Sequence, residues 1–224
     1  MSDERHGLPS ASSAHRYALC PGSFLLEQSI QQPDVSGADA QIGNRIHEYL
    51  AGEGIALNEE EIRIATDSRL QEIELVKAVF PIQDRLQIMR EKRLWDYDAD
   101  FAKSWSGKPD VVYHDATRAL VIDYKTGRIF GNEIKHGEQM QLYQLNTFLR
   151  HPELEVVHTE LWYLDHAEVR KQTFTRSQGL RFKSNFDRRG RALTTATEFK
   201  PNPNKFSCKW CMYGPWGSGH CQVG

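Results

Sequence analysis

The sequence predicts a mixed α/β (α+β) fold, in which a small mixed central sheet is flanked by helices. Helical apolar spacing dominates the first third of the chain, two β-branched runs enclose a polar turn within 107–127, and helical and strand-like segments alternate afterwards. The chain has 224 residues, of which 39% are hydrophobic and 26% charged, which suits a globular protein with a sizeable core. We therefore expect one domain, 1–224, with a core at 36–199 and end segments at 1–35 and 200–224.

The expected elements follow the chain in order. Segments with helical apolar spacing are found at 12–30, 41–51, 59–80, 132–150 and 178–195. Pro21 interrupts the first, and Pro81 is expected to kink or restart the third before Arg90. Besides the arms of the turn, segments with strand character are found at 94–102, 156–164 and 169–174. The tail from Lys200 is rich in Pro, Gly and Asn, so we expect little regular structure there.

Composition and charge limit the classes of function. The formal net charge of -2 gives no overall basic signature for nucleic acid. No apolar run is long enough to cross a membrane, and the first residues do not resemble a secretory signal, so we expect a cytoplasmic protein. One local basic cluster either follows a phosphate backbone or forms a solvated helix face; its members are Arg181, Lys183, Arg188, Arg189 and Arg191.

The predicted hairpin at 107–127 contains the strongest functional signal. With a turn at 115–118, the strand register places Asp110 opposite Asp123. Two opposed carboxylates repel each other and destabilise the sheet unless a positive charge lies between them. Lys125 lies two residues beyond Asp123 and therefore projects from the same strand face. The register thus predicts that these three side chains converge.

Two carboxylates and a lysine in this arrangement suit metal-assisted phosphodiester hydrolysis. Hard divalent cations such as Mg²⁺ and Mn²⁺ take carboxylate oxygens as ligands. Such a cation lowers the pKa of a bound water and neutralises charge on a phosphate, while a neighbouring lysine orients that water or supports the developing charge. The simpler interpretation is an exposed hairpin with ordinary surface ion pairs, and a short D…D-x-K pattern taken alone favours it.

The residues around the three side chains favour the functional interpretation. Pro109 precedes the first acid, and the apolar run 120–122 precedes the second. Thr126 and Gly127 follow the lysine. Together these features resemble the core of the PD-(D/E)xK nuclease superfamily, and the run 121–127 is especially similar to its RecB-like branch. The resemblance implies a small mixed sheet with a helix packed across it, in a metal-dependent DNA nuclease.

The same resemblance implies the metal ligands. His47 lies in a Gly-x-x-x-His-Glu segment that is similar to the first motif of RecB-like nucleases. The implied ligands are His47, Asp110, Asp123 and the backbone carbonyl of Tyr124, with Lys125 positioning the attacking water. Taken alone, a histidine beside the apolar face of a helix is more often a packed core residue.

Gln139 and Tyr143 lie four residues apart and share a helix face. They match the Gln-x-x-x-Tyr signature that follows the hairpin in the RecB-like branch, which implies that they guide a DNA strand or support Lys125. Without the hairpin, a polar helix edge with a packed tyrosine is the better interpretation. Glu91 either reaches the site from the strand before Asp110 or is simply a charged residue at a helix end.

The four cysteines predict a soft metal centre. Cys208, Cys211 and Cys221 include a Cys-x-x-Cys pair, and disulfides are not expected in a cytoplasmic protein. Four thiolates suit either zinc or an iron–sulfur cluster. The placement of Cys20 near the other end resembles iron–sulfur nucleases of the RecB-like branch, including AddB and the CRISPR-associated exonucleases, and implies a 4Fe-4S cluster joining the chain ends. The alternative is zinc held by the C-terminal cysteines with Cys20 or His220.

The resemblance implies an Mg²⁺- or Mn²⁺-dependent deoxyribonuclease, most simply an exonuclease acting on DNA ends or single strands. Recombination, repair, phage DNA processing and CRISPR adaptation are the settings it suggests. The sequence has no Walker-type Gly-rich loop, so a helicase or a recombination or annealing protein would act as a partner. Two alternatives stay open: a non-catalytic nucleic-acid-binding module that retains the fold, and a zinc-stapled interaction module.

Overall fold

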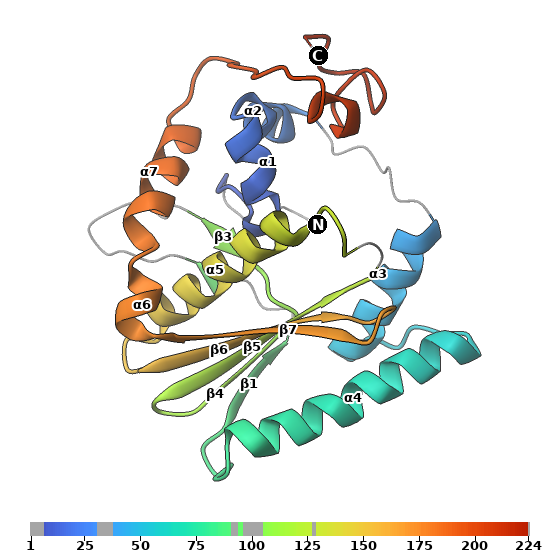
Figure 1. Cartoon of the computed structure of the whole chain (residues 1–224), viewed down its shortest axis with the longest axis vertical. Coiled ribbons are helices and arrows are strands. Elements are labelled where there is room, and N and C mark those ends of the chain that lie inside the picture. Colours follow the sequence, from blue (N-terminus) through green and yellow to red (C-terminus); the bar gives the residue numbers. More distant parts are fainter. Residues whose placement is uncertain (1–6, 31–37, 91–93, 96–104, 127–128, 224) are drawn as a thin grey trace.

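A five-stranded mixed sheet forms the centre of the computed structural model, which describes residues 7–30, 38–90, 94–95, 105–126 and 129–223 (Figure 1). The strand order is β1-β4-β5-β6-β7, and the β5–β6 pair is parallel while the other pairs are antiparallel. The strands of this sheet are β1 (Gln87–Arg90), β4 (Val111–His114), β5 (Arg118–Lys125), β6 (Val156–Tyr163) and β7 (Glu168–Thr175). A separate antiparallel pair joins β2 (Leu94–Trp95) to β3 (Ser106–Gly107). The predicted mixed α/β fold is confirmed.

Helices lie on both sides of the sheet (Figure 1). The helices on the α5 side are η1 (Ala11–Ser13), α1 (Ala14–Leu19), α2 (Gly22–Ser29), α5 (Glu133–Arg150), α6 (Arg176–Leu180) and α7 (Lys183–Thr194). On the other side lie α3 (Ala38–Ala51) and α4 (Glu59–Val79). Among the described residues, no helix combines the length and the apolar character that crossing a membrane requires.

The hairpin has the predicted register. His114 pairs with Ala119, and Val111 pairs with Ile122. The Asp115 carboxylate closes the turn by accepting hydrogen bonds from the backbone amides of Thr117 and Arg118, at 2.7 and 2.8 Å. The two arms of the hairpin are adjacent in sequence. The turn residues and the apolar pattern of the arms were therefore enough to predict which residues pair.

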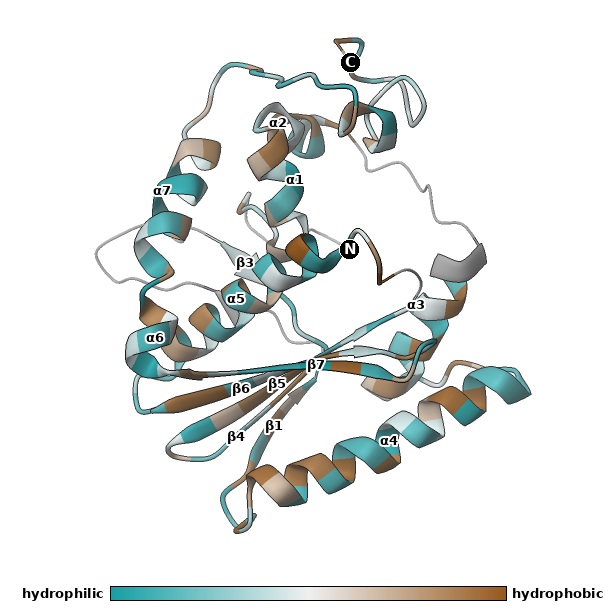
Figure 2. Cartoon of the chain, viewed as in Figure 1, coloured by the Kyte–Doolittle hydropathy of each residue, from teal (hydrophilic) through white to brown (hydrophobic). Residues whose placement is uncertain are grey.

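Alternate residues of β5 enter two different cores, as expected for a strand with a side-chain period of two. Ala119 and Val121 pack on the α5 side, whereas Leu120, Ile122 and Tyr124 pack on the α3–α4 side. Figure 2 shows the hydrophobic residues that recur along β4, β5 and β6 between the helical layers. By the same alternation, the acid and the lysine of β5 share the α5-facing side.

Two predicted elements were wrong. Residues 81–90 do not restart a helix after Pro81: 81–86 form no helix or strand, and Gln87–Arg90 form β1, an edge strand paired with β4. The helix predicted at 178–195 is divided into α6 and α7, because Gly179 packs against Phe148 and the chain then turns. Of the strand predicted at 94–102, only β2 lies within the described residues.

Gly43 lets α3 approach the end of β5. A Cβ atom built at Gly43 would lie 2.0 Å from Oγ1 and 3.1 Å from Cβ of Thr126, the residue that follows β5. Gly43 and His47 are four residues apart, so they share one helix face. The close contact therefore sets how near His47 lies to the end of β5.

We expect Gly43→Ala to lower the free energy of unfolding by about 1–3 kcal/mol, because the methyl group overpacks this contact. The matched control is Gly137→Ala on α5, where an added Cβ meets nothing within 4 Å. The control should stabilise the protein by up to about 1 kcal/mol through lower backbone entropy of the unfolded chain. Urea unfolding measures both, and equal stability of the two variants would contradict the close approach of α3.

Candidate functional site

The open end of the β4–β5 hairpin brings together both acids and the lysine predicted from the sequence. Asp110 directly precedes β4, and Asp123 and Lys125 belong to β5. Lys125 Nζ contacts Asp123 Oδ2 as an ion pair, and the Tyr124 amide donates a hydrogen bond to Asp110 Oδ2. The side chains of Asp110 and Asp123 are only 10% and 3% exposed. The two carboxylates are therefore held close to the Lys125 ammonium group and are largely shielded from water.

His47 reaches this group from α3. Its Nδ1 atom lies 3.2 Å from Asp110 Oδ1. Its ring packs edge-on against the Tyr124 ring, with centroids 5.9 Å apart. The structure thus places His47 and Tyr124 beside the acids. That His47 and the Tyr124 carbonyl bind a cation stays a prediction.

The buried charges change one another's pKa values. Burial raises the pKa of Asp123 to about 6, with Asp110 adding to the rise and Lys125 opposing it. Burial also disfavours ionised Asp110, but the hydrogen bond and charge of His47 hold the pKa of Asp110 below its ordinary value. Burial would lower the pKa of Lys125, yet the two acids raise it, so the lysine stays protonated. Asp123 is consequently the acid whose ionised form most needs a further positive charge.

The donor set fits a divalent cation. Asp123 Oδ2 is buried and makes no well-directed hydrogen bond in the described part of the chain, its only close partner being the Lys125 ammonium. A buried carboxylate oxygen in this condition is unfavourable, and a cation ligand removes that cost. With Asp110 it offers hard oxygen donors of the kind that Mg²⁺ and Mn²⁺ prefer, and His47 adds an imidazole nitrogen.

Gln139 and Tyr143 lie behind the site, in the buried core. Gln139 Nε2 donates to the Tyr143 hydroxyl at 2.7 Å, and that hydroxyl donates to the Lys108 carbonyl at 3.0 Å. The two residues are 2% and 3% exposed. They hold the backbone two residues before Asp110. That they guide a DNA strand or support Lys125 stays a prediction.

Sequence reasoning missed a polar pair beside Lys125. Tyr163 on β6 is the register partner of Lys125, and its hydroxyl lies 2.8 Å from His136 Nδ1. Burial, with the charges of Lys125 and Lys135, lowers the pKa of His136 to about 3, so this imidazole is neutral. The signal was the position of His136 three residues before Gln139, on the same face of the helix that follows the hairpin.

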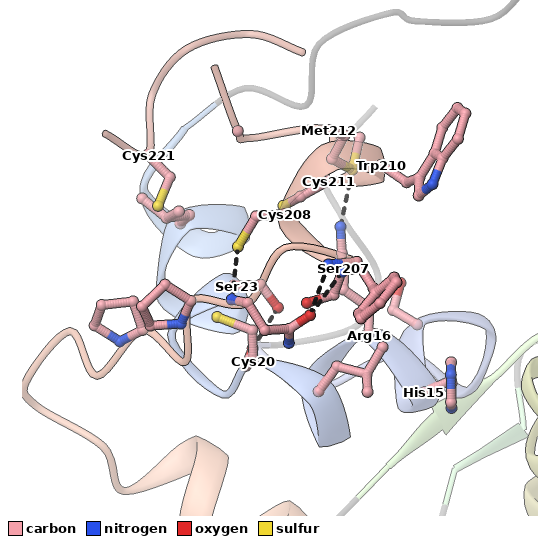
Figure 3. A pocket seen from close by; sticks show the side chains of 18 of the residues that line it. His15, Arg16, Cys20, Ser23, Ser207, Cys208, Trp210, Cys211, Met212 and Cys221 are labelled. Carbon is pink, nitrogen blue, oxygen red and sulfur yellow. Dashed lines mark hydrogen bonds between the residues drawn. The ribbon is translucent and has the colours of Figure 1, made fainter. Parts of the chain in front are cut away.

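The four cysteines line one cavity of about 580 Å³ (Figure 3). Cys20 follows α1, Cys208 begins η2 (Cys208–Trp210), Cys211 follows η2, and Cys221 lies further along the tail. None of the four forms a disulfide in the described part of the chain. Cys20 Sγ accepts a hydrogen bond from the Asn202 amide at 3.4 Å. Cys208 Sγ accepts one from the backbone amide of residue 204 at 3.3 Å. Amide hydrogen bonds of this kind stabilise thiolates and tune metal–sulfur centres.

Other contacts join the two ends of the chain. The Gly22 amide donates to the Lys200 carbonyl at 3.1 Å. Arg16 donates to Met212 Sδ at 2.8 Å and lies over the Tyr213 ring. The tail thus rests on α1 and α2, which brings the distant cysteines to the same cavity (Figure 1).

The basic cluster is partly used inside the fold. Arg189 pairs with Glu138 at 2.9 Å and donates to the Ala14 carbonyl, and Lys183 pairs with Asp187 at 2.6 Å. Arg189 therefore anchors α7 to α1 and α5, whereas the pair of Lys183 and Asp187 lies within α7. The exposed members are Arg181, Arg188 and Arg191. Glu91 lies outside the described residues.

Comparisons with known proteins identify the family to which the chain belongs. A family model described as the PD-(D/E)XK nuclease superfamily matches residues 9–216. A comparison with curated proteins finds no match. Among solved structures, the chain is similar to "Crystal structure of SSO0001", with 17% identity, a TM-score of 0.45 and coverage of 95% of this chain and 85% of that one. Because the family model spans nearly the whole chain and includes the hairpin acids and their lysine, this protein belongs to the PD-(D/E)XK nuclease superfamily.

Proposed function

We propose that the protein is an Mg²⁺- or Mn²⁺-dependent deoxyribonuclease of the RecB-like branch, acting as an exonuclease on DNA ends or single strands. The observation that carries the proposal is the buried pair Asp110 and Asp123 with Lys125 and His47 at one end of the hairpin. Membership of a superfamily of metal-dependent nucleases supports the reaction class.

Each side chain has a role in this proposal. Asp110, Asp123 and His47, with the Tyr124 carbonyl, hold the cation. When bound, such a cation lowers the pKa of water and neutralises charge on the phosphate. Lys125, which the acids keep protonated, positions the attacking water and stabilises charge that develops on the phosphate.

We place this activity in DNA recombination, repair, phage DNA processing or CRISPR adaptation, with a helicase or annealing protein as partner. The support is the likeness of segments 43–48 and 121–127 to the RecB-like branch. A reducing, cytoplasmic setting belongs to the same proposal, because cysteines that hold a metal centre must stay unpaired with one another.

Lys125→Ala should lower metal-dependent cleavage of end-labelled DNA by about 10²-fold or more, because it removes the cation that faces the developing charge. The matched control is Lys77→Ala, which removes an exposed lysine on α4. The control should cleave like wild type, and comparing single- and double-stranded substrates labelled at either end gives the polarity.

DNA binding by Lys125→Ala separates the two functional classes. A nuclease retains binding when it loses cleavage. Failure of the folded wild type to cleave under either metal, with DNA binding intact, would favour the non-catalytic module. Cleavage by Lys125→Ala at the wild-type rate would refute the role given to this lysine.

The raised pKa of Asp123 predicts an unusual pH dependence of the free energy of unfolding of the metal-free protein. Because its folded-state pKa is about 6 against an ordinary value of 3.8, the native state holds a proton that the unfolded chain loses between about pH 4 and pH 6. This group therefore lowers the free energy of unfolding as pH rises through that window. Asp123→Asn should gain stability relative to wild type over the same window, measured by chemical unfolding in EDTA. A stability difference that stays constant with pH would show that the Asp123 pKa is not raised.

We also propose that Cys20, Cys208, Cys211 and Cys221 hold a 4Fe-4S cluster, with 1–35 and 200–224 as the end segments around the 36–199 nuclease core. The support is that all four cysteines line one cavity, together with the likeness of their placement to iron–sulfur nucleases of the RecB-like branch. The alternative is a zinc ion held by the same thiolates.

Cys208→Ser should therefore lose about four iron atoms per chain and lower the thermal midpoint, since the centre joins distant segments. The matched control is Ser207→Ala, because the neighbouring Ser207 hydroxyl is buried without a hydrogen-bond partner in the described ranges. Iron, zinc and sulfide analysis with thermal unfolding measures both variants. Zinc in place of iron would support the single-ion alternative, and unchanged metal content in Cys208→Ser would refute any centre at these residues.

A further inference from the structure

A second group of metal-ligating side chains lies at the turn end of the hairpin. His114 ends β4, His151 follows α5 as its C-cap, and Glu153 lies in the loop before β6. Each offers one donor atom, and the three donors lie within 4.8 Å of one another. Across the described ranges, no other trio of His, Cys, Asp or Glu side chains meets that distance.

This group is separate from the candidate active site. His114 lies four residues beyond Asp110 along β4, which corresponds to about 13 Å of strand. The acids are at the open end of the hairpin, whereas His114 is beside its turn. The two groups therefore do not share ligands.

The imidazole rings of His114 and His151 pack against each other. Their ring centroids are 4.1 Å apart, and His114 is 5% exposed. His151 Nδ1 lies 3.3 Å from Glu153 Oε1, while His151 Nε2 is buried and has no hydrogen-bond partner within the described chain. Burial and the nearby His114 lower the pKa of His151, which favours the neutral form that binds metals. A buried imidazole nitrogen without a partner is unfavourable until something binds it.

The loop that carries two of the ligands is held in place. Arg176 Nη1 lies 3.1, 3.4 and 3.3 Å from the carbonyl oxygens of Phe148, His151 and Leu154. These contacts fix the backbone on both sides of His151 and Glu153. Preorganised ligands lose less conformational entropy when they bind an ion.

We propose that His114, His151 and Glu153 form a binding site for a divalent cation of the zinc class. Two imidazoles and one carboxylate are borderline donors, which suit Zn²⁺ better than Mg²⁺, and three protein ligands leave a fourth position for water. Glu153 is 48% exposed, so an ion reaches the site from solvent. The positive charge of Arg150 near His151 opposes a bound cation.

A zinc ion here would join the end of β4 to the loop between α5 and β6. Because the ion binds the folded state and not the unfolded chain, it stabilises the fold by mass action. The site is therefore structural in this proposal and takes no part in DNA hydrolysis.

The test is zinc binding by the full chain with its cysteine centre intact. Wild type, His151→Ala and Glu153→Gln are dialysed against chelator-buffered Zn²⁺, and bound zinc is measured by mass spectrometry of the metal. Wild type should bind one more zinc ion per chain than His151→Ala, and Glu153→Gln should weaken that ion's affinity by more than about tenfold. The matched control is His158→Ala on β6, whose imidazole bonds Thr173 at 3.0 Å outside the group.

Thermal unfolding gives a second readout. Zinc should raise the midpoint of wild type and of His158→Ala, but not that of His151→Ala. If His151→Ala does not fold, Glu153→Gln alone decides, because its side chain is half-exposed. Equal zinc content and affinity in wild type and Glu153→Gln would overturn the proposal. DNA cleavage should be unchanged in Glu153→Gln, and a wild type that binds zinc but does not cleave would count against the proposed nuclease alone.

Discussion

The convergence of two buried carboxylates at the open end of the β4–β5 hairpin is the constraint on which the rest of the structure depends. Asp110 and Asp123 adjoin paired strand residues, so the sheet cannot separate them without losing its register. Their repulsion is relieved by Lys125, by His47 and by the Tyr124 amide. That relief is incomplete, because Asp123 keeps a raised pKa and an oxygen without a well-directed hydrogen bond. A divalent cation is the natural remaining partner.

The surrounding fold fixes each relieving group in place. Gly43 allows α3 to bring His47 to the end of β5, and Tyr143 holds the backbone ahead of Asp110 through the Lys108 carbonyl. The C-terminal tail packs on α1 and α2, where the cysteine cavity forms (Figures 1 and 3). The sheet thus sets the register of the two acids, and the helices supply the side chains that contact or support them.

Local patterns allowed much of this to be predicted. The hairpin register followed from its turn and apolar runs. Most segments with helical apolar spacing are helices in the structure. The failures depend on contacts between distant segments. Residues 87–90 became an edge strand because β4 offered a partner, and the pairing of His136 with Tyr163 depends on a parallel strand far along the chain. The group of His114, His151 and Glu153 was missed for the same reason, since 36 residues lie between its two histidines. No spacing rule covers ligands brought together by a crossover.

Mn²⁺ binding measured by electron paramagnetic resonance tests the central claim most directly. Wild type, Asp123→Asn and Lys125→Ala would be titrated with Mn²⁺ in the absence of DNA. The account predicts that wild type and Lys125→Ala bind the ion, whereas Asp123→Asn loses that binding, because the carboxylate holds the cation and the lysine acts on the phosphate. Mn²⁺ binding by Asp123→Asn with wild-type affinity would contradict the account, since the paired acids would then not be the metal site.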